Sequence, residues 1–300
     1  MRMNLHHLAI FHAIAETGSI SAAAGRVHVS QPALSRELKD FEGRLGVVLF
    51  ERLPRGMRLT EPGKVLHAYS ARLFAVADSA QAAMRDFADA RTGQLSIGAS
   101  NTVGTYVLPR LVANFRSTFP QVGISLFVGN TEQVAQGVAD LRFTLGFVEG
   151  PIRVEGIVAK EFSRDELVPV VAAQHPLAGR KRATPSDING LPLLMREPGS
   201  GTRELITELL RQLNATAGSI VEFSNTEALK QAAIHGGGIA WLPGISVTRD
   251  LQDGSLVRLP IDSLAIERSF SIIRREGAYE VPAVDAFVGM IQTSSVCSTV

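Results

Sequence analysis

Four polar side chains near the amino terminus share one face of a predicted helix, and their chemistry suits DNA recognition. They are Gln31, Ser35, Arg36 and Lys39. The apolar residues Leu34, Leu38 and Phe41 recur at positions i, i+4 and i+7, so the opposite face of this helix is expected to be buried. Amide, hydroxyl, guanidinium and ammonium groups read base edges and phosphates from the major groove. The polar face is therefore a candidate DNA-reading surface.

The segment around that helix predicts two short helices joined by a three-residue turn. Small alanines let the first helix, about residues 21–27, lie close against its neighbour. Ser30 is placed to accept hydrogen bonds from the free N–H groups of the second helix, and Pro32 is tolerated in its first turn. This pattern is typical of a helix-turn-helix, although two helices and a turn also occur in proteins that do not bind DNA.

Three arginines surround the next predicted turn. Leu53-Pro54-Arg55-Gly56 is a turn signal between two short apolar runs, which predicts a hairpin, the wing of a winged helix. Arg52, Arg55 and Arg58 on such a wing suit phosphate contact or insertion into the minor groove. The alternative is a solvated loop.

A long helix is predicted after the wing, because residues 64–90 lack glycine and proline and are rich in alanine. At 1.5 Å per residue it would extend ~42 Å. Its apolar positions alternate by three and four residues, as in the seam of a dimeric coiled coil; they are Leu66, Tyr69, Leu73, Val76, Ala80, Ala83 and Phe87. The alternative is that this stripe packs on the chain's own core.

The first 63 residues resemble the amino-terminal domain of the LysR-type transcriptional regulators. The motifs that carry the resemblance are Leu8-x-x-Phe11, Ala15-Glu16-x-Gly18-Ser19, Ala22-Ala23, Val29-Ser30-Gln31-Pro32-Ala33-Leu34-Ser35, Glu42, Leu45-Gly46-x-x-Leu49-Phe50-x-Arg52 and Leu59-Thr60-x-x-Gly63. We expect the DNA-binding residues to be Ser30, Gln31, Pro32, Ser35, Arg36, Lys39, Arg52, Arg55 and Arg58. A dimer would place two recognition helices on one face of a palindromic site on double-stranded DNA.

Short apolar runs alternate with helical patterns from residue 94 onward, which predicts α/β architecture with mostly parallel sheets and helices on both faces. The predicted strands are 94–98, 122–128, 144–148, 167–172, 220–223, 239–242 and 270–274. The predicted helices are 107–119, 132–141, 202–213 and 227–235.

The resemblance implies that this second part is a two-lobed effector domain similar to periplasmic solute-binding proteins, in which the chain crosses twice between the lobes. The expected domains are a winged helix-turn-helix at 1–61, a linker helix at 62–91 and an effector-binding domain at 92–300. Lobe one is expected at about 92–163 plus 268–300, and lobe two at about 164–267.

Four polar turns fall where predicted strands lead into predicted helices. Ligands of open α/β sheets lie at such places, where helix N-termini favour an anion. The candidate effector-binding residues are Ser100, Asn101, Thr102, Asn130, Thr131, Ser200, Gly201, Thr202 and Thr226. Each turn taken alone also fits a simple helix cap. Arg196 and Arg203 would add positive charge there, unless they are solvated.

Two further short segments refine this interpretation. Residues 196–204 resemble LysR-type regulators tied to carbon, nitrogen and sulfur assimilation, whose effectors are often small anions. Thr144 departs from the family, because many relatives have an aspartate there. Gly236-Gly237-Gly238 is interpreted as a helix stop and tight turn, since it precedes a strand.

The sequence does not favour an enzyme. His175 and His235 have no triad or metal-ligand neighbours in the sequence, and His6 and His7 are expected to be surface or packing residues. We therefore expect no catalytic residue, no metal and no cofactor. A solute sensor without a DNA role is a third class, and the complete winged-helix pattern argues against it.

Composition is compatible with this interpretation. Hydrophobic residues make up 45% of the 300 residues and the formal net charge is only +1, although basic residues outnumber acidic ones within residues 1–63. The single cysteine, Cys297, precludes a disulfide within the chain. No signal peptide and no apolar run long enough to span a bilayer is recognised, so we expect a cytoplasmic protein without membrane contact.

We therefore expect a homo-oligomeric, sequence-specific DNA-binding regulator controlled by a small anionic metabolite. The resemblance implies that a dimer of dimers is the active unit. The residues themselves do not distinguish two chains from four.

Overall fold

The chain folds into two units, residues 1–81 and 82–300, which are described separately. The computed structural model describes residues 3–53, 56–88, 93–279 and 281–293. Among these residues, no helix combines the length and the apolar character needed to cross a membrane.

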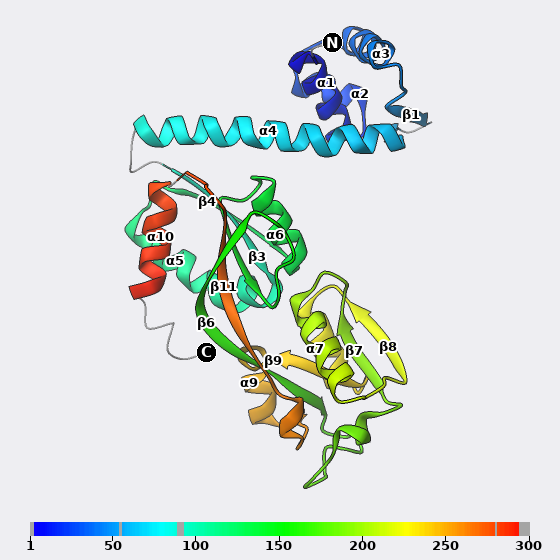
Figure 1. Ribbon diagram of the computed structural model, residues 1–300, viewed down its shortest axis with the longest axis vertical. Coiled ribbons are helices and arrows are strands. Elements are labelled where there is room, and N and C mark those ends of the chain that lie inside the picture. The colour runs from blue at the N-terminus through cyan, green and yellow to red at the C-terminus, as the bar shows by residue number, and fades with distance from the viewer. Residues whose placement is uncertain (1–2, 54–55, 89–92, 280, 294–300) are drawn as a thin grey trace. The chain divides into compact units, whose positions relative to one another are not determined.

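The amino-terminal unit consists of helices and one small hairpin (Figure 1). Its elements are α1 (Leu5–Thr17), α2 (Ile20–Arg26), α3 (Gln31–Leu45), β1 (Phe50–Leu53), β2 (Gly56–Leu59) and α4 (Glu61–Ala88), whose last turns extend beyond the unit. The antiparallel pairing of β1 with β2 confirms the predicted hairpin. Residues 54 and 55 lie outside the described residues, and with them the expectation for Arg55.

Capping residues set the ends of these helices. The Asn4 side chain accepts a hydrogen bond from the His6 amide at 2.9 Å, and Gly18 ends α1 with a φ of 63°, which glycine adopts without a steric penalty. Ser30 is the N-cap of α3, but its side chain makes no capping hydrogen bond, so that prediction was wrong. A serine N-cap bonds the amide at N2 or N3, and Pro32 at N2 has no amide hydrogen.

The core of this unit joins all three short helices to the hairpin. The fully or nearly fully buried apolar side chains are Leu8, Ile10, Phe11, Ala13, Ile14, Ala23, Ala24, Leu34, Leu38, Phe41, Leu49 and Phe50. Leu34, Leu38 and Phe41 are buried as predicted. Leu66 and Phe74 of α4 pack against the same core, so the first half of α4 is part of this fold.

Helix α4 otherwise presents apolar side chains to solvent in the single chain. Tyr69, Leu73 and Val76 of the predicted seam are 66%, 39% and 51% exposed. Leu66 is half-buried against the core formed by α1, α2, α3 and the hairpin, which together are called the head below. Leu66, the first position of the predicted seam, is therefore covered by the core of its own chain. The side chains of Ala83 and Phe87 lie outside the described residues.

The carboxyl-terminal unit has two lobes that share long strands. Its strands are β3 (Gln94–Ser100), β4 (Gly123–Gly129), β5 (Leu145–Glu149), β6 (Ile157–Ala172), β7 (Pro192–Arg196), β8 (Ser219–Phe223), β9 (Ile239–Pro243), β10 (Leu256–Arg258) and β11 (Ile266–Arg275). Its α-helices are α5 (Leu108–Thr118), α6 (Thr131–Ala139), α7 (Gly201–Gln212), α8 (Thr226–Ile234), α9 (Gly244–Asp253) and α10 (Pro282–Thr293), with a π-helical turn at Val103–Val107 and 3₁₀ turns at Pro185–Ile188 and Asp262–Leu264.

The strands pair in the order β4-β3-β5-β11-β6-β9-β7-β8, with β10 beside β6. The β3, β4 and β5 strands are parallel to one another, as are β7, β8 and β9. All pairings that involve β6 or β11 are antiparallel. The prediction of mostly parallel sheets was therefore only partly right, because two antiparallel strands link the parallel halves.

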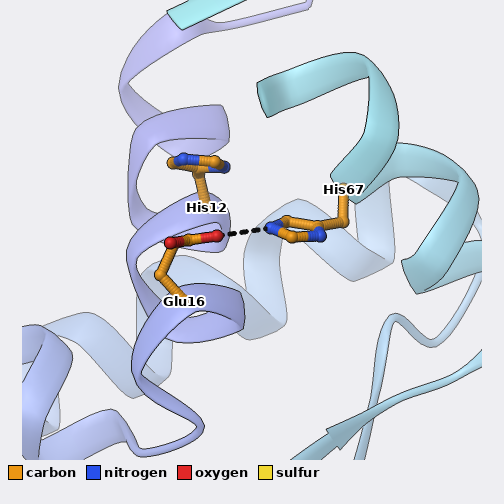
Figure 2. A group of neighbouring side chains, drawn as sticks. All are labelled: His12, Glu16 and His67. Atoms are coloured by element: carbon orange, nitrogen blue, oxygen red, sulfur yellow. Dashed lines mark hydrogen bonds and ion pairs between the residues drawn. The ribbon is translucent and has the colours of Figure 1, made fainter. Parts of the chain in front are cut away.

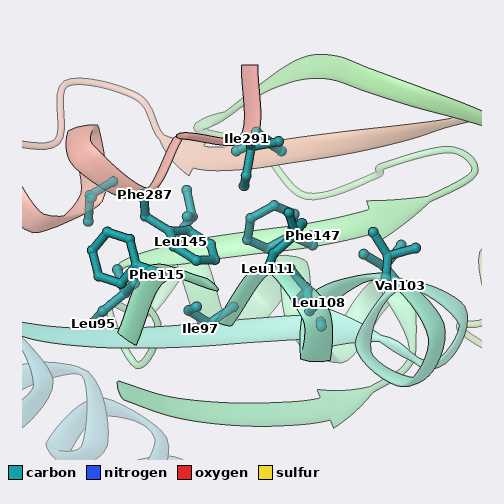
Figure 3. Close-up of a cluster of buried hydrophobic side chains, with 14 of the residues drawn as sticks. Leu95, Ile97, Val103, Leu108, Leu111, Phe115, Leu145, Phe147, Phe287 and Ile291 are labelled. Atoms are coloured by element: carbon teal, nitrogen blue, oxygen red, sulfur yellow. The ribbon is translucent and has the colours of Figure 1, made fainter. Parts of the chain in front are cut away.

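Strands β6 and β11 are the two crossings between the lobes, and they pair from Ile157 to Leu167 of β6 (Figure 1). Strand β6 contributes Phe162 to the core of the first lobe, and Leu167 and Val171 to a core of the second. Figure 3 shows the first of these cores, where α5 covers β3. The fold is the expected α/β architecture of a winged helix-turn-helix, a long helix and a two-lobed domain.

Candidate functional sites

The polar face of α3 lies away from the core, as predicted. Ser30, Gln31 and Pro32 at the start of the helix are exposed, and so are Arg36 and Lys39. Ser35 is half-buried. The buried leucines on the opposite face fix the rotation of α3, so this polar surface faces solvent.

The hairpin is held to the helices by backbone contacts. The Met57 amide donates to the Gly18 carbonyl at 2.8 Å, and a Cβ at Gly56 would lie 2.7 Å from that carbonyl oxygen, so only glycine fits there. Arg52 and Arg58 are both exposed on this wing. Arg58 forms an ion pair with the cross-strand Glu51, whose carboxylate holds the guanidinium over the sheet.

All nine candidate effector residues are buried in the carboxyl-terminal unit, and several of them form hydrogen bonds that join the two lobes. The predicted polar turns do start helices: Asn130 caps α6 in a reciprocal pair with Gln133, and Asn225 caps α8. Ser200 is the N-cap of α7 without a side-chain capping bond. Sequence spacing thus located the helix starts, and the structure adds the contacts among them.

A buried arginine that the sequence interpretation missed joins residues from both lobes. Arg268 of β11 donates through Nη2 to Thr102 Oγ1 at 3.2 Å and through Nη1 to Thr202 Oγ1 at 2.8 Å. Thr102 follows β3 in the first lobe, and Thr202 lies in the first turn of α7 in the second. One guanidinium therefore contacts the two threonines that the sequence placed in the site.

Two buried carboxylates partner this guanidinium. Asp165 lies directly opposite Arg268 in the β6–β11 register, and its Oδ2 accepts from Nε at 2.9 Å and from Nη2 at 2.6 Å. Glu149 Oε1 lies 3.7 Å from Nη1, and Ser100 donates its hydroxyl hydrogen to the same carboxylate. Burial raises the pKa of the Asp165 carboxyl, the Arg268 guanidinium opposes this rise, and the neighbouring Glu149 adds to it.

Further hydrogen bonds cross between the lobes nearby. The Asn130 side chain donates through Nδ2 to Glu197 Oε1 at 3.2 Å, and Thr131 Oγ1 accepts from the Gly201 backbone amide at 3.3 Å. The backbones approach closely here, because a Cβ at Gly201 would lie 2.1 Å from the Glu149 carbonyl oxygen. Only glycine therefore allows this contact at the start of α7.

A tyrosine makes another contact between the lobes. Tyr106 Oη donates to Glu227 Oε2 at 2.7 Å, which joins the π-helical turn of the first lobe to α8 of the second. Burial raises the pKa of the Tyr106 phenol, and its hydrogen bond to Glu227 raises it further. Burial alone would raise the pKa of Glu227, but hydrogen bonds from Tyr106, Gln231 and Lys230 lower it overall, so this carboxylate is ionised near neutral pH.

The remaining predicted positions have clear structural roles. Arg196 is buried and donates to Thr226 Oγ1 at 2.8 Å and to Glu197 at 2.8 Å, so it is not solvated. Arg203 donates to Glu222 at 2.7 Å. Both positive charges are therefore neutralised by neighbouring carboxylates.

Thr144, where the sequence departs from the family pattern, bonds to the backbone of β3. Its hydroxyl donates to the Ser96 carbonyl at 2.9 Å and accepts from the Ser96 amide at 3.2 Å. Gly236 and Gly238 have φ values of 81° and 144° between α8 and β9, as a helix stop and tight turn require.

Histidines are not among the residues that form the contacts between the lobes described above. His7 is buried and pairs with Glu37 at 2.8 Å, which fits the expected packing role, and His6 is exposed. The sequence interpretation passed over His12 and His67, which approach each other only because α4 packs on α1.

Comparison with known proteins identifies both units. A family model described as a bacterial regulatory helix-turn-helix protein of the lysR family matches residues 5–64, and the LysR substrate binding domain matches residues 88–295. The chain is similar to YeiE of Escherichia coli K12, an uncharacterized HTH-type transcriptional regulator, with 36% identity over 266 residues that cover 88% of this chain and 89% of YeiE. It is 33% identical to the HTH-type transcriptional regulator CbbR of Rhodospirillum rubrum, over 97% of both chains.

A solved regulatory domain extends this comparison. The regulatory domain of Synechocystis CcmR in complex with 2-PG has a TM-score of 0.64 and 26% identity, and it covers 69% of this chain and 99% of that one. Together with the two family models, which span both units, these similarities leave one assignment. The chain belongs to the LysR family of bacterial transcriptional regulators.

Proposed function

We propose that this regulator binds specific DNA sequences through α3 and the wing, and that a small anionic metabolite held between the two lobes controls its DNA binding or bending. The observation that carries the metabolite site is the contact of Arg268 with Thr102 from one lobe and Thr202 from the other. A ligand at these residues touches both lobes at once. Its binding energy then depends on how the lobes are arranged, as control of a two-state protein requires.

The hydroxyl chemistry favours a ligand with acceptor oxygens. Thr102 and Thr202 each accept a hydrogen bond from Arg268, so each keeps its own hydroxyl hydrogen for donation. The starts of α6 and α7 meet here through Thr131 and Gly201, and the positive ends of two helix dipoles favour negative charge.

The charges around Arg268 indicate which groups would bind the anion. Asp165 and Glu149 already neutralise Arg268, so direct contact between the anion and the guanidinium is disfavoured when both carboxylates are ionised. The donors would instead be threonine hydroxyls and helix amides. Ser100 is committed to Glu149 in this arrangement. The description of CcmR in complex with 2-PG supports small-molecule binding by a domain of this fold.

The DNA-reading surface of this proposal is the exposed polar face of α3 with Arg52 and Arg58 of the wing. Arg36 and Lys39 suit base and phosphate contact, because both project from the face opposite Leu34 and Leu38. The site of action is the cytoplasm, where bacterial DNA is found.

Dimerisation through α4 completes the proposal. The exposed residues Tyr69, Leu73 and Val76 follow the three-four alternation of a coiled-coil seam, and Val65 and Met84 are also exposed on this helix at 60% and 64%. Burial of these side chains in a homodimer removes apolar surface from water. We propose a winged helix-turn-helix at 1–61, a linker helix at 62–91 and an effector-binding domain at 92–300, assembled as a dimer or as a dimer of dimers.

Thr102→Val tests the metabolite site. The substitution removes a donor at nearly constant shape, so calorimetry should show effector binding weakened by about 1–3 kcal/mol. The ligand is first identified by native mass spectrometry of the purified protein, with 2-PG as the starting probe. Thr118→Val in α5 is the matched control, because Thr118 is exposed and remote from the lobe contact.

Footprinting of the same variant separates sensing from DNA binding. Thr102→Val should bind DNA as the parent does without effector, and its response should need proportionately more ligand. Unaltered effector affinity, or outright loss of DNA binding, would contradict a role for Thr102 in the site. The proposed site would then rest on Ser200 and Thr202 alone.

A further inference from the structure

Two histidines and a glutamate come together in the amino-terminal unit. His12 and Glu16 are one helical turn apart on α1, and His67 reaches them from α4 (Figure 2). One candidate ligand atom from each of these side chains lies within 4.8 Å of the other two. His67 Nε2 is 3.0 Å from Glu16 Oε1, and the His12 and His67 rings stack with their centroids 5.4 Å apart.

Ser70 fixes which nitrogen of His12 carries a proton. The buried Ser70 hydroxyl donates its only hydrogen to the His67 carbonyl at 3.0 Å, so it accepts from His12 Nδ1, which lies 3.1 Å away. This leaves the Nε2 lone pair of the neutral His12 ring available. A ligand histidine whose other nitrogen donates to an oxygen is the usual arrangement around protein metal ions.

An aromatic ring borders the cluster on one side. The Phe74 ring packs against the His12 imidazole with the centroids 5.1 Å apart. This packing limits the positions that the His12 ring can adopt.

We propose that His12, Glu16 and His67 form a binding site for a divalent transition-metal ion, with Zn²⁺ as the ion that fits best. Two imidazoles and one carboxylate are a known Zn²⁺ donor set that leaves a fourth position for water. Bonds of about 2.0–2.2 Å in tetrahedral geometry bring ligand atoms to roughly 3.3 Å from one another. Side-chain rotation can close the remaining distance, because Glu16 is exposed and His67 is only half-buried.

The ion would join α1 of the head to α4. The metal replaces the proton that His67 now shares with Glu16, while the Ser70 contact continues to orient His12. The bound ion would therefore stabilise the folded amino-terminal unit, because the unfolded chain does not hold the three ligands together.

The experiment measures Zn²⁺ binding to the full-length, untagged protein after treatment with chelator. All variants carry Cys297→Ser, so that the thiol does not compete for the metal. Calorimetry with Zn²⁺ alone should show one ion per chain, and Zn²⁺ should raise the midpoint of thermal unfolding. His12→Ala and His67→Gln should each weaken this binding at least tenfold and abolish the thermal shift.

Two further variants keep the result interpretable. His6→Ala is the matched control, because His6 is exposed on the same helix and lies outside the cluster; it should bind Zn²⁺ as the parent does. Glu16→Gln removes the charge at an exposed position, so it should fold normally and still lose affinity. Equal Zn²⁺ affinity and stoichiometry in the parent and His67→Gln, or no binding by the parent, would overturn the proposal.

Discussion

Removal of the positive charge of Arg268 should strongly destabilise the carboxyl-terminal unit. The side chains of Arg268 and Asp165 are each 1% exposed and that of Glu149 is 3% exposed, so Arg268→Met leaves two buried carboxylates without their cation. Breaking a buried ion pair from one side costs about 3–5 kcal/mol. We expect the free energy of unfolding of Arg268→Met to fall by an amount in that range.

The chain's single tryptophan makes this measurement specific to one unit. Trp241 is buried in β9, where its Nε1 donates to the Leu264 carbonyl at 2.8 Å, so urea unfolding followed by its fluorescence reports on the carboxyl-terminal unit. Arg274→Met is the matched control on the same strand. Arg274 pairs with Asp285 at 3.0 Å near the surface, and such pairs contribute about 1 kcal/mol or less.

The effect should depend on pH in a defined direction. Burial raises the pKa of Asp165 in the folded protein and Arg268 opposes this rise, so loss of the guanidinium raises that pKa further. A carboxyl whose folded-state pKa exceeds its unfolded value adds stability at low pH, and this stability is lost as the pH rises through the folded pKa. The deficit of Arg268→Met relative to the parent should therefore be smaller near pH 5 than near pH 8. A deficit no larger than that of Arg274→Met at either pH would refute the reasoning.

Two predictions concern the amino-terminal unit. Arg36→Ala should lose about 1–3 kcal/mol of sequence-specific DNA affinity without loss of folding, as footprinting at matched salt would show, whereas Arg44→Ala at the end of α3 should bind nearly as the parent does. Parental footprints for Arg36→Ala would contradict the assignment of that face. Leu73→Asp should weaken dimerisation in sedimentation experiments, because like charges would meet in the seam, whereas Gln81→Asp on the same helix is the control. An unchanged assembly size for Leu73→Asp would mean that the apolar stripe has another role.

Local patterns predicted most of the elements, because helix spacing, capping residues and turn signals act over a few neighbouring residues. Leu34, Leu38 and Phe41 were enough to orient α3, and the polar turns located the starts of α6, α7 and α8. Strand β7 was missed, since Pro192 at its start gives no strand signal.

Contacts between distant residues were not predictable in the same way. Arg268 and Asp165 are 103 positions apart, and only the register of β11 on β6 places them opposite each other. His67 and Glu16 are 51 positions apart and meet through the packing of α4. The strand predicted at 270–274 did not include Arg268, and β11 carries other charged residues such as Glu267 and Arg274, so the sequence did not single out Arg268 as a buried side chain.

Leu66 and Phe74 pack on the core of the head, so the first half of α4 is attached to the head by side-chain contacts. Each residue added to an α-helix turns everything beyond it by about 100° and advances it by about 1.5 Å. A single residue inserted after Phe74 would therefore rotate Val76 and the residues beyond it by more than a quarter turn relative to Tyr69 and Leu73, which precede the insertion. In a dimer joined through α4, the number of residues in this helix would therefore set the rotation of one DNA-binding head relative to the other.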